Sequence, residues 1–199
     1  YAYQELKAII DLQLSASNTE LNYPLFFHPL SETNEQILYE DEKICISNVI
    51  LNHTIKCSGF IFKEKKSKRK IIKEIIEQYN IPFDKYNGIK EGADWIADNG
   101  EIIKNKVITR ENTPVHSYAF CTDTIYNEAL IEKIKGIDLL YHEATFKKDF
   151  ADRAKETGHS TTYEAATIAK KSAVKNLLIG HFSQRYKNID ELFIEAKAT

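Results

Sequence analysis

The sequence is poor in several residue types: its 199 residues include no methionine, four prolines, seven glycines and three cysteines. Cys45, Cys57 and Cys121 are far apart and form no CxxC pair, which argues against a disulfide framework and against a thiolate zinc site. We interpret them as three buried thiols of a protein from a reducing cytoplasm. No apolar run reaches about 18 residues and no signal peptide is visible, so we predict no membrane association.

The sequence contains no methionine even at its first position, which is Tyr1. This absence indicates either a segment of a longer chain or methionines omitted from the sequence. The formal net charge of −2 excludes a protein that binds nucleic acid through overall basicity. Any such contact has to come from a local patch. Residues 63–70, which read KEKKSKRK, are the one candidate, with six basic side chains in eight.

The first half of the sequence has a mixed pattern. Amphipathic spacing predicts helices at 3–14 and 71–79. Residues rich in β-branched and aromatic side chains predict strands at 24–28, 36–39, 43–50 and 55–63. Residues 80–92 are rich in turn formers, and residues 94–103 indicate a hairpin with Asn99-Gly100 as its tight turn.

From residue 117 onward the pattern becomes regular. Apolar strands are predicted at 117–124, 137–145 and 176–182, and they alternate with helices at 126–134, 147–156, 161–172 and 189–198. This alternation predicts an α/β fold with a sheet covered by helices. Asp123, His142 with Glu143, and His181 stand at three strand ends, where ligands and chemistry collect in such sheets.

Any single histidine in this sequence is more often structural than functional. We interpret His28 and His116 as ordinary strand or surface residues and assign His142 to the structure, with function an equal alternative. The case for a site therefore depends on the set formed by His53, Glu143, His159, His181 and Asp123.

Four stretches, CTDT, YHEATF, ETGHSTTYEAA and LLIGHFSQRY, resemble in this order the ribonuclease Z family, tRNA 3′-processing endonucleases of the metallo-β-lactamase superfamily. YPLFFH, LYEDEKICISNVILNH, SGFIFKEK and NIP agree as well, so the resemblance covers nearly the whole chain, as the C-terminal two-thirds of such an enzyme. The implied fold is an α/β metallo-β-lactamase-like αββα sandwich, incomplete at the N-terminus. Residues 1–199 would form a partial domain with an inserted exosite-like arm at about 63–105.

The resemblance implies two zinc ions held by seven side-chain positions. Four belong to an HxHxDH motif that is absent here and is expected upstream of Tyr1, and the other three match His53, Asp123 and His181. Histidine and carboxylate ligands suit catalytic zinc, and an aspartate can bridge paired metals. The alternative for Asp123 is an N-cap of the following helix.

The resemblance also implies a proton-transfer pair. His159 would protonate the departing 3′ oxygen as general acid, and Glu143 would orient that imidazole and favour its protonated form. The alternative is that Ser160 or Thr161 simply caps the helix at 161–172 and that His159 is incidental.

The basic run begins what resembles the exosite of the family, an arm that grips tRNA by neutralising phosphates. After NIP the family often has a glycine–proline pair, whereas this sequence continues with Phe83, Asp84 and Lys85. The alternative is a solvated charged loop. The candidate substrate-binding residues are Lys65, Lys66, Lys68, Arg69, Lys70 and Arg185.

The implied activity is a zinc-dependent endoribonuclease that removes 3′ trailers from tRNA precursors and leaves a 3′-hydroxyl on the tRNA. Its partners would be precursor tRNA and a second copy in a homodimer. One alternative is a phosphodiesterase or small-ester hydrolase of the same fold. Another concerns this chain alone, which would be inactive, would hold zinc poorly with three of seven ligand positions, and would only bind tRNA or dimerise.

Overall fold

The computed structural model describes residues 3–31 and 33–199 and divides the chain into two compact units. The first unit comprises Tyr1–Ile37, Ser47–Ile61 and Tyr118–Thr199, and the second unit comprises Leu38–Ile46 and Phe62–Ser117. The arm expected at about 63–105 falls within the second unit, whose bounds are wider. Within the described ranges no helix has the length and apolar character that a membrane crossing requires.

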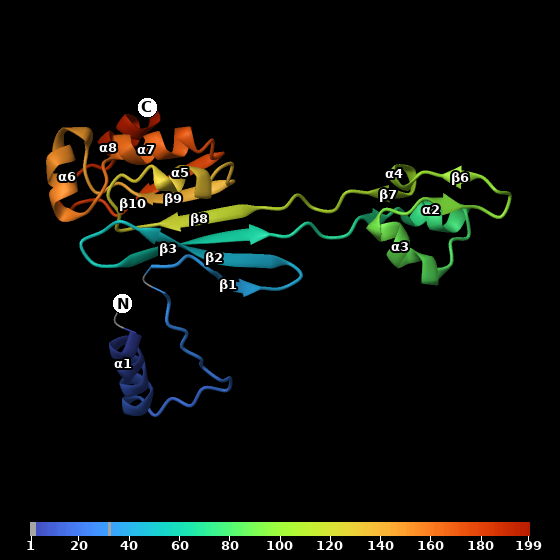
Figure 1. Ribbon diagram of the computed structural model, residues 1–199, viewed down its shortest axis with the longest axis horizontal. Coiled ribbons are helices and arrows are strands. Elements are labelled where there is room, and N and C mark those ends of the chain that lie inside the picture. The colour runs from blue at the N-terminus through green and yellow to red at the C-terminus, as the bar shows by residue number, and fades with distance from the viewer. Residues whose placement is uncertain (1–2, 32) are drawn as a thin grey trace. The chain divides into compact units, whose positions relative to one another are not determined.

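The largest sheet has six strands in the order β1-β2-β3-β8-β9-β10 (Figure 1). The three strands predicted in the second half of the sequence lie side by side and parallel, with Tyr141 paired to Phe120 on one side and to Leu178 on the other. Parallel strands bring their carboxyl ends to one edge of the sheet, which is where Asp123, Glu143 and His181 stand. The strands are β1 (Ile37–Glu40), β2 (Ile44–Leu51), β3 (Cys57–Glu64), β8 (Ser117–Cys121), β9 (Leu139–Glu143) and β10 (Asn176–Gly180).

Helices cover one face of this sheet in the first unit, where Figure 1 shows α5, α7 and α8 together. Leu130 of α5 and Ile168 of α7 pack with Ala119 and Leu140 of the strands in one apolar core. The predicted α/β alternation is therefore confirmed. The helices are α5 (Ala129–Lys133), α6 (Ala151–Thr157, preceded by the 3-10 turn η2, Lys148–Phe150), α7 (Thr162–Lys171) and α8 (Asp190–Lys197).

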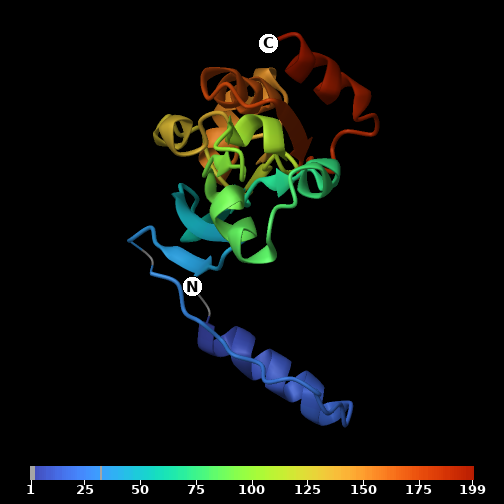
Figure 2. The same ribbon diagram turned by 90° about the vertical axis from the view of Figure 1, so that its right-hand side faces the viewer.

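The N-terminal segment contains helix α1 (Tyr3–Ala16), close to its predicted bounds. None of its residues is buried, and Leu6, Ile9 and Leu12 are exposed. The strand predicted at 24–28 is wrong, because these residues form an irregular segment that returns toward the start of α1 (Figure 2). The prolines at positions 24 and 29 frame this segment, and each removes a backbone donor that pairing in a sheet would need.

The second unit has its own core, formed by Ile81, Ile89, Ile103 and Ile108. Residues 80–92, expected to be turns, contain a 3-10 turn and a helix that ends at Gly92, whose φ of +117° gives a left-handed cap. The elements are β4 (Lys70–Ile71), α2 (Lys73–Gln78), η1 (Phe83–Lys85), α3 (Tyr86–Glu91), β5 (Trp95–Ile96), β6 (Ile102–Ile103), α4 (Asn105–Ile108) and β7 (Thr109–Arg110).

The predicted hairpin is present, since β5 and β6 pair antiparallel. Its turn differs from the two-residue turn expected from Asn99-Gly100. The amide of Ala97 bonds the carbonyl of Glu101 at 2.9 Å, which leaves a three-residue loop in which Gly100 takes a φ of +83°. A left-handed residue at the end of such a loop is the usual way to close it, and glycine adopts that conformation without strain.

Candidate active site

Asp123 and His181 stand just beyond the ends of β8 and β10, and both have left-handed backbones, with φ of +47° and +63°. Such values are uncommon for residues other than glycine and indicate strain that the surroundings hold in place. The strained backbones aim the two side chains at each other, with 3.2 Å between His181 Nε2 and Asp123 Oδ1. Because α5 begins only at Ala129 and has Glu128 as its N-cap, the alternative role of Asp123 as a helix cap is wrong.

His53 follows the end of β2 and reaches the same place. Its Nδ1 lies 2.7 Å from the carbonyl oxygen of Gly158. Since a carbonyl only accepts, Nδ1 carries the hydrogen and Nε2 keeps its lone pair, the tautomer that a metal ligand needs. The imidazole of His53 lies 5.0 Å from that of His159, measured between ring centroids.

Glu143 ends β9 and has a fully buried side chain. Its Oε1 accepts from the amide of Thr124 at 2.8 Å and from His159 Nδ1 at 2.8 Å. Its Oε2 lies 2.6 Å from the hydroxyl oxygen of Thr145. A buried carboxylate with donors on both oxygens is held rigidly, so it fixes the plane of the imidazole that it contacts.

His159 has its Nδ1 committed to Glu143, which leaves Nε2 for the site. Its ring lies 5.1 Å from that of His181, and 17% of its side chain is exposed. The helix α7 is capped by Thr161, whose side chain forms a capping box with Glu164. The alternative prediction that Thr161 caps this helix is therefore confirmed. His159 is not incidental to the structure, however, because it contacts Glu143 independently of the cap.

Four residues, Asp123, Glu143, His159 and His181, each offer a possible ligand atom, and these atoms lie within 4.8 Å of one another. His53, expected as a ligand, is outside this group. Glu143 and His159 direct their facing atoms at each other, and His181 Nε2 faces Asp123 Oδ1 at 3.2 Å. The hydrogen bond of His53 uses Nδ1 and leaves Nε2 as its possible ligand atom. Nitrogen and oxygen donors without thiolate fit a divalent metal such as zinc.

None of the cysteines belongs to the group of possible metal ligands formed by Asp123, Glu143, His159 and His181. Cys57 begins β3, and burial together with the charge of Asp123 raises the pKa of its thiol. Burial raises the pKa of Cys121 to about 12. All three cysteines are free, but the expectation that all are buried is wrong for Cys45 and Cys57, which are partly exposed. Cys45 lies in β2 and Cys57 begins β3, and both strands are only partly buried at these positions.

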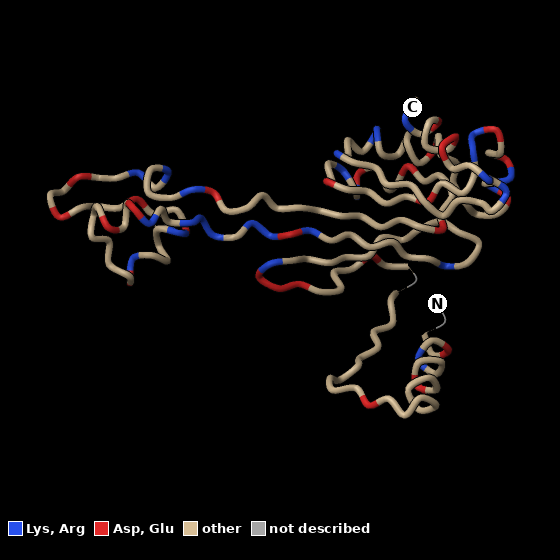
Figure 3. The backbone as a smooth tube through the Cα atoms, turned by 180° about the vertical axis from the view of Figure 1, so that it is seen from behind, with Lys and Arg blue, Asp and Glu red and all other residues tan. Residues whose placement is uncertain are grey.

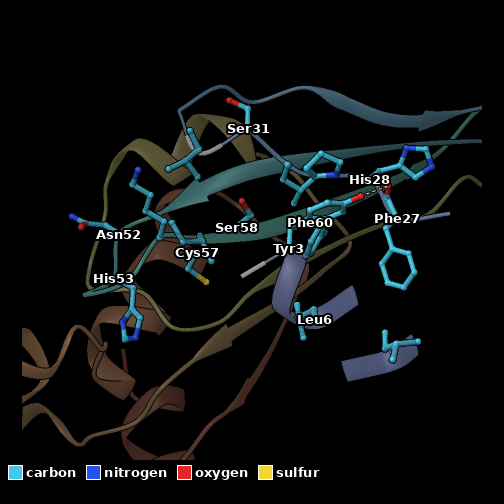
Figure 4. Close-up of a pocket in the computed structure, with 16 residues that line it drawn as sticks. Tyr3, Leu6, Phe27, His28, Ser31, Asn52, His53, Cys57, Ser58 and Phe60 are labelled. Carbon is cyan, nitrogen blue, oxygen red and sulfur yellow. Dashed lines mark hydrogen bonds between the residues drawn. The ribbon is translucent and has the colours of Figure 1, made fainter. Parts of the chain in front are cut away.

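A pocket of about 660 Å³ in the first unit opens beside His53 (Figure 4). The ends of β2 and β3 form one wall through Asn52 and Ser58, and α1 forms another through Tyr3 and Leu6. The hydroxyl of Tyr3 donates to the carbonyl oxygen of Phe27 at 3.3 Å. The pocket therefore joins the edge of the candidate site to the apolar side of α1.

The basic residues predicted within the run 63–70 lie in the second unit, where basic and acidic residues are interspersed (Figure 3). Four of them contact glutamates of the same unit: Lys65 with Glu40 at 2.7 Å, Lys68 with Glu91 at 2.7 Å, and both Lys66 and Arg69 with Glu111. Lys70 is exposed on β4.

Arg185 belongs to the first unit instead, with its guanidinium 4.9 Å from the ring centroid of Phe146 and 4.7 Å from that of Phe150. The candidate substrate-binding residues thus fall into two groups.

Three residues of the site were not anticipated from the sequence. Thr124 and Thr145 bind the carboxylate of Glu143, and Gly158 receives the hydrogen bond from His53. Gly158 has a φ of +79°, and a methyl group added there would lie 2.6 Å from His53 Nδ1. Gly158 and Thr145 stand in the GHST and HEAT letters, but the partner of Gly158 is 105 positions away and that of Thr124 is 19 positions away, so no local pattern reveals these two contacts.

No family model matches the chain. The chain is 44% identical over 178 residues to Ribonuclease Z of Bacteroides thetaiotaomicron, covering 89% of this chain and 56% of the relative. It is 39% identical over 196 residues to Ribonuclease Z of Phocaeicola vulgatus, covering 98% of this chain and 63% of the relative. The chain thus spans less than two-thirds of the length of these curated relatives.

Two solved structures are similar to the chain. The short form of human tRNase Z has a TM-score of 0.54 and 24% identity, with 92% of this chain and 60% of that chain covered. The metallo-β-lactamase fold protein YhfI from Bacillus subtilis has a TM-score of 0.51 and 19% identity, with 82% and 46% covered. The similarities confirm the resemblance read from the sequence motifs and the α/β metallo-β-lactamase-like fold.

Proposed function

We propose that this chain is part of a ribonuclease Z-type endoribonuclease, a hydrolase that removes 3′ trailers from tRNA precursors and leaves a 3′-hydroxyl on the tRNA. The observation that carries this proposal is the His159–Glu143 pair, joined at 2.8 Å beside Asp123, His181 and His53. The identity to relatives named Ribonuclease Z supports the substrate class. The complete enzyme would work in the cytoplasm, where free thiols persist.

His53, Asp123 and His181 would hold the metal in this enzyme, together with an HxHxDH segment outside this sequence. We propose two zinc ions, which when bound supply an activated water and neutralise charge on the phosphate. The donor chemistry supports this proposal, since two neutral imidazoles and one carboxylate suit a catalytic zinc site with an open position. The strain at Asp123 and His181 aims both donors without further rearrangement.

His159 would deliver the proton in the cleavage step. Glu143 holds Nδ1–H of His159, so the proton available for transfer is on Nε2 of the imidazolium. When water attacks the phosphorus, the bond from phosphorus to the 3′ oxygen breaks and its electron pair remains on that oxygen. The oxygen takes the Nε2 proton and leaves as the 3′-hydroxyl, a step for which a positioned acid supplies roughly 10²–10⁴-fold.

Arg185 would bind a phosphate next to this acid. Its guanidinium is held by the rings of Phe146 and Phe150, and Nε lies 3.3 Å from the hydroxyl of Ser183. The ring of Phe146 is also 6.5 Å from that of His159. Stacked arginine loses little further freedom when it binds a phosphate, which supports a clamp at this position.

The second unit would bind the precursor tRNA through its basic run at 63–70. A small-ester hydrolase of the same fold would not need this unit, which gives a direct test. Residues 66–113 can be replaced by a short glycine linker, which keeps the hydrogen bond of 2.9 Å from the amide of Glu64 to the carbonyl of His116. We expect precursor tRNA cleavage to disappear while hydrolysis of bis(p-nitrophenyl) phosphate persists.

Survival of precursor cleavage after this replacement would overturn the proposed role of the second unit. Hydrolysis of the small ester without any precursor cleavage by the unaltered enzyme would favour the small-ester alternative. Mapping the cleaved 3′ end, with His159→Ala as the inactive control, tests the reaction itself.

The 199-residue chain by itself is proposed to be inactive. Three ligand positions leave each of two metals with too few side chains for tight binding. Elemental analysis of the purified chain should find well under two zinc ions per chain, and two ions would contradict this proposal. The complete enzyme is proposed to be a homodimer, which light scattering after gel filtration would test.

A further inference from the structure

Thr145 places one hydroxyl between the two parts of the candidate site. Its side chain is buried, and its Oγ1 lies 2.6 Å from Glu143 Oε2, 2.9 Å from His181 Nδ1 and 2.9 Å from the carbonyl oxygen of His181. The backbone around it is tied to the end of β10, since the amide of Ser183 donates to the Thr145 carbonyl at 3.0 Å. The hydroxyl therefore has a fixed position rather than a choice of rotamers.

The hydrogen count at this hydroxyl decides the direction of each bond. Thr145 Oγ1 has one proton, and three possible acceptors surround it. The carboxylate of Glu143 is the nearest and the charged one, so it takes that proton. Neither the carboxylate nor the carbonyl can donate. Only the imidazole of His181 can supply a second hydrogen, so its Nδ1 is protonated and donates to Thr145.

With Nδ1–H directed at Thr145, Nε2 is the nitrogen of His181 left to bind a metal, and it lies 3.2 Å from Asp123 Oδ1. The same carboxylate that receives the Thr145 proton receives Nδ1–H of His159 on its other oxygen. One continuous path thus runs from His181 through Thr145 and Glu143 to His159. The path fixes the tautomer of the ligand at one end and the orientation of the acid at the other.

We propose that Thr145 is a positioning residue that couples the metal ligand His181 to the proton-transfer pair Glu143–His159. The inference rests on the function proposed above, since it assigns His181 to the metal and His159 to proton transfer. Partners of this kind fix ring tautomers, and removing them costs roughly 10–100-fold in metal affinity or activity. The hydroxyl, and not the bulk of the side chain, is the group required.

Three variants of the complete enzyme distinguish a requirement for the hydroxyl of Thr145 from a requirement for the bulk of its side chain. Thr145→Val keeps the shape and removes the hydroxyl, and Thr145→Ser keeps the hydroxyl and removes the methyl group. Thr162→Val is the matched control, because Thr162 is also buried in the same unit but its hydroxyl bonds Glu195 instead. The readouts are the histidine tautomers from ¹⁵N NMR of the metal-free enzyme, zinc affinity from chelator competition, and kcat with KM.

We expect Thr145→Val to lose the fixed Nδ1–H tautomer of His181, to bind zinc about 10–100-fold more weakly, and to lower kcat more than it changes KM. Thr145→Ser should stay within about 3-fold of the parent in affinity, an expectation from the same partner geometry. Thr162→Val should leave the tautomers unchanged. An equal effect of Thr145→Ser and Thr145→Val would overturn the proposal, because packing would then explain it.

The complete enzyme without any substitution, the parent, also tests the inference. This test does not depend on whether the variants fold. An Nδ1 of His181 that carries no hydrogen in the metal-free parent would contradict the assigned path. This readout needs no activity, so a parent enzyme that fails to cut precursor tRNA would sink the proposed function and still leave the tautomer result interpretable.

Discussion

The first unit of the chain contains a buried charge network that the described residues of the second unit lack. In the first unit Glu143 is fully buried and each of its oxygens has donors, whereas in the second unit Glu111 keeps 71% of its side chain exposed beside Lys66 and Arg69. Buried networks fix geometry at a high cost if one partner is removed, and exposed ion pairs contribute about 0–1 kcal/mol each. The first unit is therefore suited to orienting reactive groups and the second to weak, exchangeable interactions.

The charge totals sharpen this contrast. The second unit contains 13 lysines and arginines against 12 aspartates and glutamates. Its basic run at 63–70 is thus nearly balanced by acidic residues elsewhere in the same unit. RNA binding through this unit would have to exchange internal ion pairs for phosphates, and the gain per residue would be small.

The largest expected effect comes from removing the acid in the buried site. His159→Ala in the complete enzyme should lower kcat about 10²–10⁴-fold with little change in KM, because the departing oxygen loses its proton donor. Single-turnover cleavage of precursor tRNA measures the chemical step. Lys66→Ala from the second unit is the comparison, and a similar fall in kcat for both would break the distinction between the units.

Gly158 tests how tightly the same site is packed. Gly158→Ala should displace His53, since the added methyl group would lie 2.6 Å from its Nδ1. We expect zinc affinity to fall by about 10-fold or more, as it does when other hydrogen-bond partners of metal-binding histidines are removed. Chelator competition measures it.

Gly136→Ala is the control, since Gly136 has a φ of +68° but nothing within 4 Å of an added methyl group. Both variants carry the backbone strain, and only Gly158→Ala carries the clash. Equal zinc affinities in the two variants would show that His53 does not depend on the close approach of Gly158.

Much of the first unit could be predicted from the sequence because its signals are local. Apolar strands and amphipathic helices alternate from residue 117, and the strand ends mark Asp123, Glu143 and His181 directly. Thr145 could not be identified in this way, since its partner His181 is 36 positions away. Nor does any local pattern reveal the left-handed backbones of Asp123 and His181, which depend on tertiary packing.

The second unit was harder to predict because its elements are short. Helix α3 contains Gly88 and follows a proline-containing turn, which are signals of a loop, yet Ile89 of this helix is buried in the core of the unit. The strands β4 and β7 have two residues each, too few to show a period. Long-range packing, and not local preference, selects these elements.

A smaller effect concerns stability and the buried histidine of the first unit. His142 is fully buried, and its Nε2 has no partner among the described residues, so burial lowers its pKa below the ordinary value of 6.5. The unfolded chain then binds a proton that the folded chain does not. The free energy of unfolding should fall as the pH drops below about 6.5, by up to about 1.4 kcal/mol per pH unit. Above about pH 6.5, His142 should make no pH-dependent contribution to the free energy of unfolding.

Denaturant titrations of the complete enzyme between pH 7.5 and 5 would measure this slope, and His142→Leu should flatten it. His116→Leu, which removes an exposed histidine of the second unit, is the matched control. An unchanged slope in His142→Leu would show that acid sensitivity comes from other groups.

The smallest expected effect lies in the exposed unit and concerns binding rather than chemistry. Replacing Lys66 and Lys68 by alanine should raise KM for precursor tRNA a few-fold and leave kcat unchanged. The slope of log affinity against log salt concentration should become shallower by about 1 for each phosphate that is no longer neutralised. Lys197→Ala, an exposed lysine of α8 in the first unit, is the control.

The effect should stay small because Lys68 already pairs with Glu91 at 2.7 Å and has to give up that ion pair to reach a phosphate. Glu91→Gln should therefore act in the opposite direction, lowering KM and steepening the salt dependence. If Glu91→Gln instead weakened binding, the ion pairs of the second unit would be holding its surface in shape, and the difference between the units would be one of exposure alone.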